Sequence, residues 1–409
     1  MTLASRPWPK FALVGLFTGL AAYMAFAAAL AGVAQTSNAD LALRFSSNDP
    51  VALAVKADQM LANATSRPPR PGTLLKTALR SLNANPTNAR AVRLVGIAYG
   101  LLNNPARAAR LYGLANQISR RDLGNQLLLI EGLVDKGDAV GALKHYDIVL
   151  RTSPSGQATL FPILFSAMDD PTIRAEVSKL IGANPPWLKP FLSYALAQNV
   201  GLANVADTVI AGGGLPTDET FAPYQNALLA RLIDTGQFAA LERYGRSVKT
   251  TASSQLTSVA FRPPSATARF QPLAWQLSQD NGVTSHIETE KSARGALMNV
   301  FAAPDNRWLA ARKLLFVTSG MHTFKVEQTI VETGNDAEVQ WQISCAQTQA
   351  VLWASDRQNA AGHRSIRQSI FVPDGCRVLW ISVIAAGGAS ENGMEMVARS
   401  IALTPATRP

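Results

Sequence analysis

The sequence has few of the residues that catalysis and metal binding use most often. Its 409 residues include four histidines and two cysteines. It contains no His-Glu-x-x-His pair, no Gly-x-Ser-x-Gly turn and no Cys-x-x-Cys pair, so zinc hydrolases, serine esterases and dithiol oxidoreductases lose their usual sequence support. We therefore predict no catalytic residues, no metal and no cofactor. A glycan-processing enzyme is kept as an alternative, because a glycosidase pair could come from Glu288, Glu290, Glu327 and Glu332.

Acidic residues are also scarce relative to basic ones. The chain has 28 Asp and Glu against 38 Lys and Arg, which gives a net charge of +10. Such a balance favours acidic surroundings such as anionic lipid or an acidic polymer. The densest basic group has no aromatic residues between its members to stack on bases, so we do not expect a nucleic acid partner. This group consists of Arg107, Arg110, Arg120 and Arg121.

The two cysteines, Cys345 and Cys376, both lie in the last fifth of the chain. An even, low count is compatible with one disulfide, which forms if the strands that carry these residues adjoin or face each other. Two separate buried thiols are the alternative.

One long hydrophobic run follows Arg6 and Lys10. Residues 11–34 carry no charge and are mostly apolar, which is long enough to span a bilayer at ~1.5 Å per helical residue. The basic residues before this run place residues 1–10 in the cytoplasm and everything after it across the membrane. We therefore predict a single-pass protein of a bacterial inner membrane with its C-terminal domains in the periplasm. A cleaved signal peptide is the alternative.

Residues 38–249 are predicted to form paired helices with an internal period. Ala108 and Ala142 are 34 residues apart, and so are Tyr112 and Tyr146. A small residue, an aromatic residue four positions later and a proline at the helix end resemble the tetratricopeptide family, which implies an α-solenoid whose groove binds a protein partner. The predicted repeat-packing residues are Gly96, Tyr99, Ala108, Tyr112, Ala115, Ala142, Tyr146 and Pro154.

The pattern changes after a polar, proline-containing linker at residues 250–267. In residues 268–405, helical periodicity gives way to strict alternation of apolar and polar residues, as in 338–345. Eight or nine short strands separated by turn residues predict an antiparallel β-sandwich.

This last third resembles jelly-roll domains of the carbohydrate-binding-module type. The similarity rests on 270–275 as an opening strand, on 319–326 as a glycine turn into a strand, and on Trp341 and Trp380 in central strands. We expect both tryptophans in the core, because they share a face with the cysteines. Trp308 and Trp353 lie nearer turns and polar residues, so they are the candidates for binding a glycan.

These predictions combine into a chain of several domains, first α and then β. The expected order is a single transmembrane helix, a tetratricopeptide-like α-solenoid and a C-terminal antiparallel β-sandwich of the jelly-roll type. This architecture resembles single-pass proteins associated with bacterial envelope or exopolysaccharide production, which implies a non-enzymatic scaffold with a protein partner and a polysaccharide ligand. A protein-only assembly factor for division or secretion machinery is the main alternative.

Overall fold

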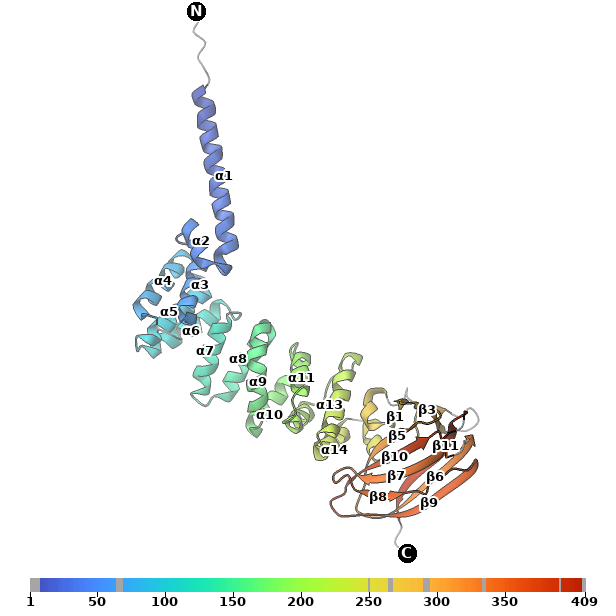
Figure 1. The fold of residues 1–409 in the computed structure, drawn as a ribbon. Helices are drawn as coiled ribbons and strands as arrows, with labels where there is room; N and C mark the ends of the chain where they lie inside the picture. Colours follow the sequence, from blue (N-terminus) through green and yellow to red (C-terminus); the bar gives the residue numbers. More distant parts are fainter. Residues whose placement is uncertain are drawn as a thin grey trace, which may run out of the picture. The chain divides into compact units, whose positions relative to one another are not determined.

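The computed structural model describes residues 8–63, 69–248, 251–263, 268–289, 295–332, 336–389 and 391–406 (Figure 1). Most of the predicted cytoplasmic segment 1–10 and part of the predicted linker 250–267 lie outside these residues. The chain divides into two compact units, Met1–Leu160 and Phe161–Pro409. The domain boundaries drawn from the sequence stay predictions.

The first unit is helical, and most of its helices begin in the same way. An Asp or Asn immediately before the helix accepts a hydrogen bond from the backbone N–H three residues further on, as Asp122 does from Asn125. This side chain satisfies a donor that has no partner within the helix. The helices are α1 (Trp8–Ser37), α2 (Ala39–Phe45), α3 (Pro50–Ala62), α4 (Pro71–Ala84), α5 (Ala89–Leu101), α6 (Pro105–Ile118), α7 (Leu123–Val134) and α8 (Ala139–Thr152).

The hydrophobic run lies in the helix α1, but it does not form the transmembrane helix that the sequence predicts. Crossing a bilayer takes about 20 predominantly apolar residues in one helix. Over the residues that the structure describes, no helix has the length and apolarity for this. The predicted transmembrane helix at 11–34, and the single-pass inner-membrane location derived from it, are therefore wrong. Ala34, near the end of this run, packs instead with Ala39 and Ala42 of α2 and with Ala52 and Val55 of α3.

Neighbouring helices of the first unit pack through small residues. Helix α4 packs on α5, α5 on α6 and α7 on α8. Ala54 and Ala57 of α3 share a buried cluster with Ala78 of α4 and Ala98 of α5. Alanine at such positions lets two helix axes approach closely while leaving little space unfilled.

The second unit begins with further helices and ends with the sheets. Helix α9 (Pro154–Ala167) contains the boundary between the units. Trp187, Phe191 and Leu228 are buried at the centre of the helices that follow. These elements are α10 (Pro171–Gly182), α11 (Leu188–Leu196), α12 (Leu202–Ala211), η2 (Glu219–Phe221), α13 (Ala222–Asp234), α14 (Phe238–Ser247), α15 (Thr251–Thr257) and η4 (Ala268–Leu273).

Two antiparallel sheets complete the second unit, so the predicted order of helices followed by a sandwich is confirmed. Sheet A has five strands in the order β1-β5-β10-β7-β8, and sheet B has six in the order β2-β3-β4-β11-β6-β9. Helix α13 packs on η4, and α15 packs on both η4 and β5. The strands are β1 (Gln276–Leu277), β2 (Gln279–Asp280), β3 (Val283–Thr289), β4 (Ala296–Ala302), β5 (Arg307–Phe316), β6 (Gly320–Glu332), β7 (Glu338–Cys345), β8 (Val351–Ala354), β9 (Gly362–Val372), β10 (Val378–Ala386) and β11 (Met394–Pro405).

The core between the sheets is built around Trp341 of β7. Its ring packs against Phe324 of β6 at 5.8 Å and against Trp275 at 6.3 Å between centroids. Its indole nitrogen donates a hydrogen bond to Gln328 at 2.7 Å, which satisfies the polar end of a fully buried ring. Trp341 is therefore a core residue, as its alternation predicts.

Cys345, at the end of β7, forms a disulfide with Cys376, just before β10. The two Cα atoms are 5.7 Å apart, within the ordinary range for a disulfide. The predicted disulfide is confirmed.

Candidate functional site

The outward side of sheet A carries a partly exposed row of polar side chains. Leu379, Ile381 and Val383 of β10 lie in the core, so the alternate residues of that strand face away from it. The strand register then places one such residue from each of four neighbouring strands side by side. We call these residues and the Trp380 ring beside them the sheet-A platform: Gln276 of β1, Arg312 of β5, Ser382 of β10 and Gln342 of β7, together with Trp380.

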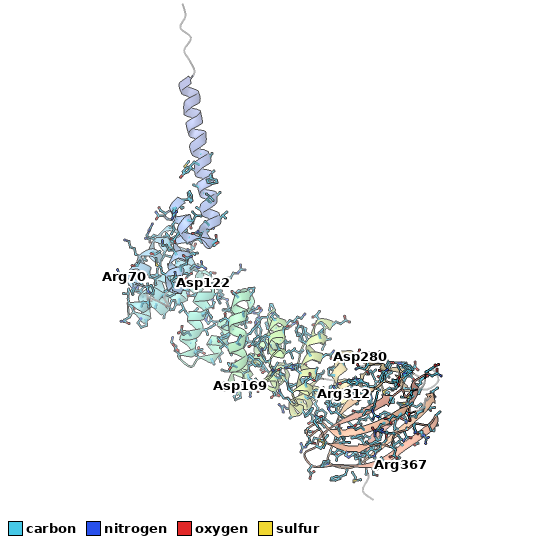
Figure 2. All side chains as sticks on the ribbon, in the orientation of Figure 1. Arg70, Asp122, Asp169, Asp280, Arg312 and Arg367 are labelled. Atoms are coloured by element: carbon cyan, nitrogen blue, oxygen red, sulfur yellow. A yellow bond between two sulfur atoms is a disulfide. The ribbon has the colours of Figure 1, made fainter. Side chains whose placement is uncertain are left out.

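Arg312 and Trp380 form the centre of the platform. Figure 2 labels Arg312 on the sheets. The guanidinium carbon of Arg312 lies 4.4 Å from the centroid of the Trp380 ring, which is cation–π geometry. The Nε of Arg312 donates a hydrogen bond of 2.7 Å to Oε1 of Gln276. These two interactions hold a planar cation against a half-buried aromatic ring, with the amide of Gln342 and the hydroxyl of Ser382 in the same row.

A groove borders the platform at its β1 edge. It has a volume of about 380 Å³ and lies between α13, η4, β1 and β5. Arg312 lines it from the sheet, while Ile233 and Asp234 line it from α13. The platform therefore continues into a wall made by a helix, and Asp234 brings a carboxylate to the same groove as Arg312.

The opposite end of the same sheet face carries charged side chains that form ion pairs. Glu338 of β7 forms ion pairs with Arg307 of β5 and with Arg357. Glu338 and Arg307 both lie opposite Ala386 of β10 in the strand register. A second groove, of about 490 Å³, is lined by these charged residues and by Asp305.

The sequence-based candidates for glycan binding lie apart from this platform. Trp308, at the start of β5, is 51% exposed. Trp353 of β8 is half-buried and packs against Phe324 of the core, with ring centroids 5.4 Å apart. That these two residues bind a glycan stays a prediction.

Trp380 does not lie where the sequence predicts it. Alternation from Cys376 places Trp380 in the core, but β10 begins at Val378, and the register sets Leu379 opposite Cys345. Trp380 therefore lies opposite Ser344, on the outward face, and the prediction of a core position is wrong. The signal that could have found it is Ser382, a polar residue two positions after Trp380 and therefore on the same face of the strand.

The first unit has a groove of its own, of about 880 Å³, lined by residues of α3, α5 and α7. Arg93 of α5 lies in it, almost buried between two carboxylates. Its Nη2 is 2.9 Å from Oδ1 of Asp58 in α3, and its Nε is 3.1 Å from Oδ1 of Asp122. Gly124 leaves room for this guanidinium, because a Cβ there would lie 2.9 Å from its carbon. The groove therefore presents fixed charges of both signs.

The predicted repeat residues lie at helix contacts or helix ends. A Cβ on Gly96 would lie 2.7 Å from a ring carbon of Tyr112, so α5 and α6 approach closely at this glycine. Tyr99 is half-buried, and the guanidinium of Arg107 lies over its ring at 4.1 Å. Ala108, Ala115 and Ala142 are buried, Tyr146 is half-buried and Pro154 begins α9. That they mark tetratricopeptide repeats stays a prediction.

Comparison with known proteins gives structural likeness without a family assignment. No family model and no curated protein matches this sequence. A third of the chain, 32%, is similar to 88% of TmCBM61 solved in complex with beta-1,4-galactotriose, at 12% identity and a TM-score of 0.24. A CBM4 structure matches 31% of this chain over 90% of its own length, at 12% identity and a TM-score of 0.22. The CBM22-1 xylan-binding domain of Paenibacillus barcinonensis Xyn10C matches 32% of this chain over 87% of its own length, at 10% identity and a TM-score of 0.22.

Proposed function

We propose that this protein is a non-enzymatic scaffold that binds a glycan on the sheet-A platform. The observation that carries this proposal is the stacked pair of Arg312 and Trp380 beside the side chains of Ser382 and Gln342. Sugars are bound by aromatic rings that contact their C–H faces and by amide, hydroxyl and guanidinium groups that bond their hydroxyls. The platform brings both kinds of group to one half-exposed surface.

The groove of the first unit is proposed to bind a protein partner, as a tetratricopeptide-like solenoid would. Its support is the pair of carboxylates around Arg93 and the further cations of Arg90 and Arg121, which together offer fixed charges to a polar segment of a partner. A scaffold with both sites would hold a partner beside a polysaccharide during its assembly or export.

The glycan proposal is tested with the full-length chain. Binding to a glycan array and then isothermal titration with the selected oligosaccharide would compare the protein with Trp380→Ala and Trp308→Ala. We expect Trp380→Ala to weaken binding about tenfold or more, since a central aromatic side chain dominates binding energy at such sites. Trp308→Ala is the matched control, because it removes an exposed tryptophan of the same sheet away from the platform.

Two outcomes would contradict the platform assignment. Loss of binding in Trp308→Ala but not in Trp380→Ala would move the site to the end of β5. No binding of any glycan by a folded protein would favour the protein-only assembly factor. In that second function the sandwich would have a packing role, which the contacts of α13 with η4 and of α15 with β5 support.

A further inference from the structure

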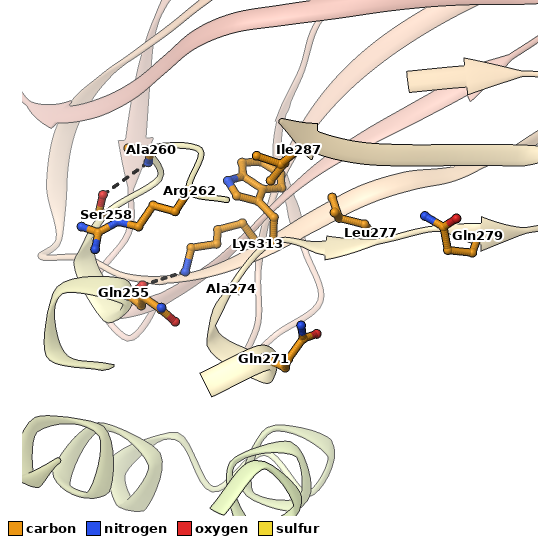
Figure 3. A pocket seen from close by; sticks show the side chains of 11 residues that line it. Gln255, Ser258, Ala260, Arg262, Gln271, Ala274, Leu277, Gln279, Ile287 and Lys313 are labelled. Atoms are coloured by element: carbon orange, nitrogen blue, oxygen red, sulfur yellow. Dashed lines mark hydrogen bonds between the residues drawn. The ribbon is translucent and has the colours of Figure 1, made fainter. Parts of the chain in front are cut away.

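The sandwich and the last helices enclose a cavity that the platform does not use (Figure 3). We call it the junction cavity. Its volume is about 160 Å³, and it is lined by Gln255 of α15, by Arg262, by Trp275 after η4, by Ile287 of β3 and by Lys313 of β5, among others. A cavity of this size has room for several water molecules, so it can admit a small polar ligand.

Lys313 brings a buried amino group to the junction cavity. Its side chain is 2% exposed. Its Nζ donates to the backbone carbonyl of Gln255 at 2.6 Å, to that of Leu314 at 3.2 Å and to that of Leu273. All three partners accept hydrogen bonds and none donates, which favours the ammonium form, while burial and the charge of Arg262 lower the pKa of Lys313 to about 7. The lysine thus joins α15, η4 and β5 and leaves its amino group at the wall of the cavity.

Gln255 brings an unsatisfied amide to the same space. The residue is 3% exposed, and neither its Oε1 nor its Nε2 has a hydrogen-bond partner in the described part of the chain. Leaving a buried polar group unpaired is unfavourable, because the group has lost its hydrogen bonds to water. A bound molecule that both donates and accepts, as a hydroxyl group does, would supply the two missing partners.

The ionisable side chains described in the cavity lining are all basic. Lys313 and the half-buried Arg262 line it, and no Asp or Glu is found among its described lining residues. Trp275 adds an aromatic wall, with its indole nitrogen already bonded to the carbonyl of Val259 at 2.9 Å. Gln271 and Gln279 add further amides at the edge.

From these observations we propose that the junction cavity binds one acidic monosaccharide unit, a hexuronate. Its carboxylate lies toward Arg262 and Lys313, its ring lies along Trp275, and its hydroxyls bond the amide of Gln255. A neutral hexose would leave Arg262 and the protonated form of Lys313 without a counter-charge, and a small carboxylate would leave the Gln255 amide unpaired. This site is separate from the platform and does not depend on the function proposed for it.

The test is isothermal titration of the full-length protein with D-glucuronate, D-glucose and acetate at one fixed ionic strength. We expect glucuronate to bind at least about tenfold more tightly than either of the other two, because a charge-assisted hydrogen bond and the hydroxyl contacts are both required. Arg262→Gln should weaken glucuronate binding about tenfold. Arg364→Gln, at an exposed position of β9, is the matched control and should bind as the unchanged protein does.

Gln255→Met tests the amide without changing the volume of the side chain much. It should weaken glucuronate binding and also raise the midpoint of thermal unfolding without ligand, because an unpaired amide is removed. Equal binding of glucose and glucuronate, equal binding of acetate, or no effect of Arg262→Gln would each overturn the proposal. Trp380→Ala should leave glucuronate binding unchanged, so failure at the platform and failure at the junction cavity are distinguishable.

Discussion

Arg312 of β5 stacks on Trp380 of β10, with the guanidinium carbon 4.4 Å from the ring centroid. The two residues are neighbours because Arg312 lies opposite Ser382 and Trp380 lies opposite Leu314 in the register of the two strands. The cation also bonds Gln276 of β1, so its position is set from two sides. This relationship holds a planar cation and an aromatic ring in a fixed relative position on the outer face of sheet A.

The first prediction concerns the planarity of this cation. Arg312→Lys keeps the charge but removes the flat group that stacks on Trp380 and bonds Gln276. We expect glycan affinity to fall by about threefold to tenfold with little change in stability, because the position is on the outer face. Isothermal titration and the thermal unfolding midpoint would measure the two effects. Unchanged affinity in the folded variant would show that the stacked guanidinium does not orient the ligand.

The second prediction concerns the buried cation of the first unit. Arg93→Met should cost about 3–5 kcal/mol in free energy of unfolding, because it leaves the carboxylates of Asp58 and Asp122 without their buried partner. Arg90→Met is the matched control, since Arg90 pairs with the same Asp58 from a more exposed position, and should cost about 1 kcal/mol or less. Urea denaturation followed by circular dichroism measures both. Similar costs for the two variants would contradict the role given to Arg93.

The third prediction is a pH dependence that arises from Lys313. Burial, assisted by the nearby positive charge of Arg262, lowers the pKa of Lys313 to about 7. An unfolded lysine titrates near ~10.4, so between these values the unfolded chain binds the proton more tightly. The contribution of this group to stability is therefore complete above the unfolded pKa and is lost as the pH falls through about 7.

Lys313→Met should remove this dependence, because methionine fills similar space without a titrating group. Between about pH 7 and about pH 9, we expect the unfolding free energy of the unchanged protein to rise relative to that of the variant. The expected rise is on the order of 2 kcal/mol. Urea denaturation at the two pH values measures it. A difference that stays constant, or that shifts the other way, would show that burial does not lower this pKa.

The fourth prediction concerns the disulfide. Replacing Cys345 and Cys376 by serine should lower the free energy of unfolding by about 2–4 kcal/mol, because the unfolded chain is no longer constrained by the cross-link. A reductant should lower the thermal midpoint of the protein and leave that of the double variant unchanged. If the reductant affects both equally, its action lies elsewhere than at this disulfide.

Local pattern was sufficient for the order of elements in this chain. Alternation in 338–345 predicts a strand with one buried face, and the structure buries Val339, Trp341, Ile343 and Cys345. The cysteine pairing followed from there being two cysteines on strands that could adjoin. The strand depends on residues that are close in sequence. The disulfide needed no choice of partner, because the chain has two cysteines.

The hydrophobic run at residues 11–34 is a place where amino-acid composition led to a wrong prediction. Its apolar residues predict a membrane span, yet the structure finds no helix suited to one among the described residues and packs Ala34 against α2 and α3. Small apolar residues suit both lipid and a close helix contact, and the sequence does not distinguish the two environments.

By itself, the sequence determined that helices precede an antiparallel sandwich and that two cysteines are available to join its strands. Only the tertiary structure decided that Trp380 faces outward beside Arg312, and that Lys313 and Gln255 meet at one cavity although they are 58 residues apart. The physical reason is that alternation sets the two faces of a strand but not which strand lies beside it. The partners of a side chain depend on register and on the packing of distant elements.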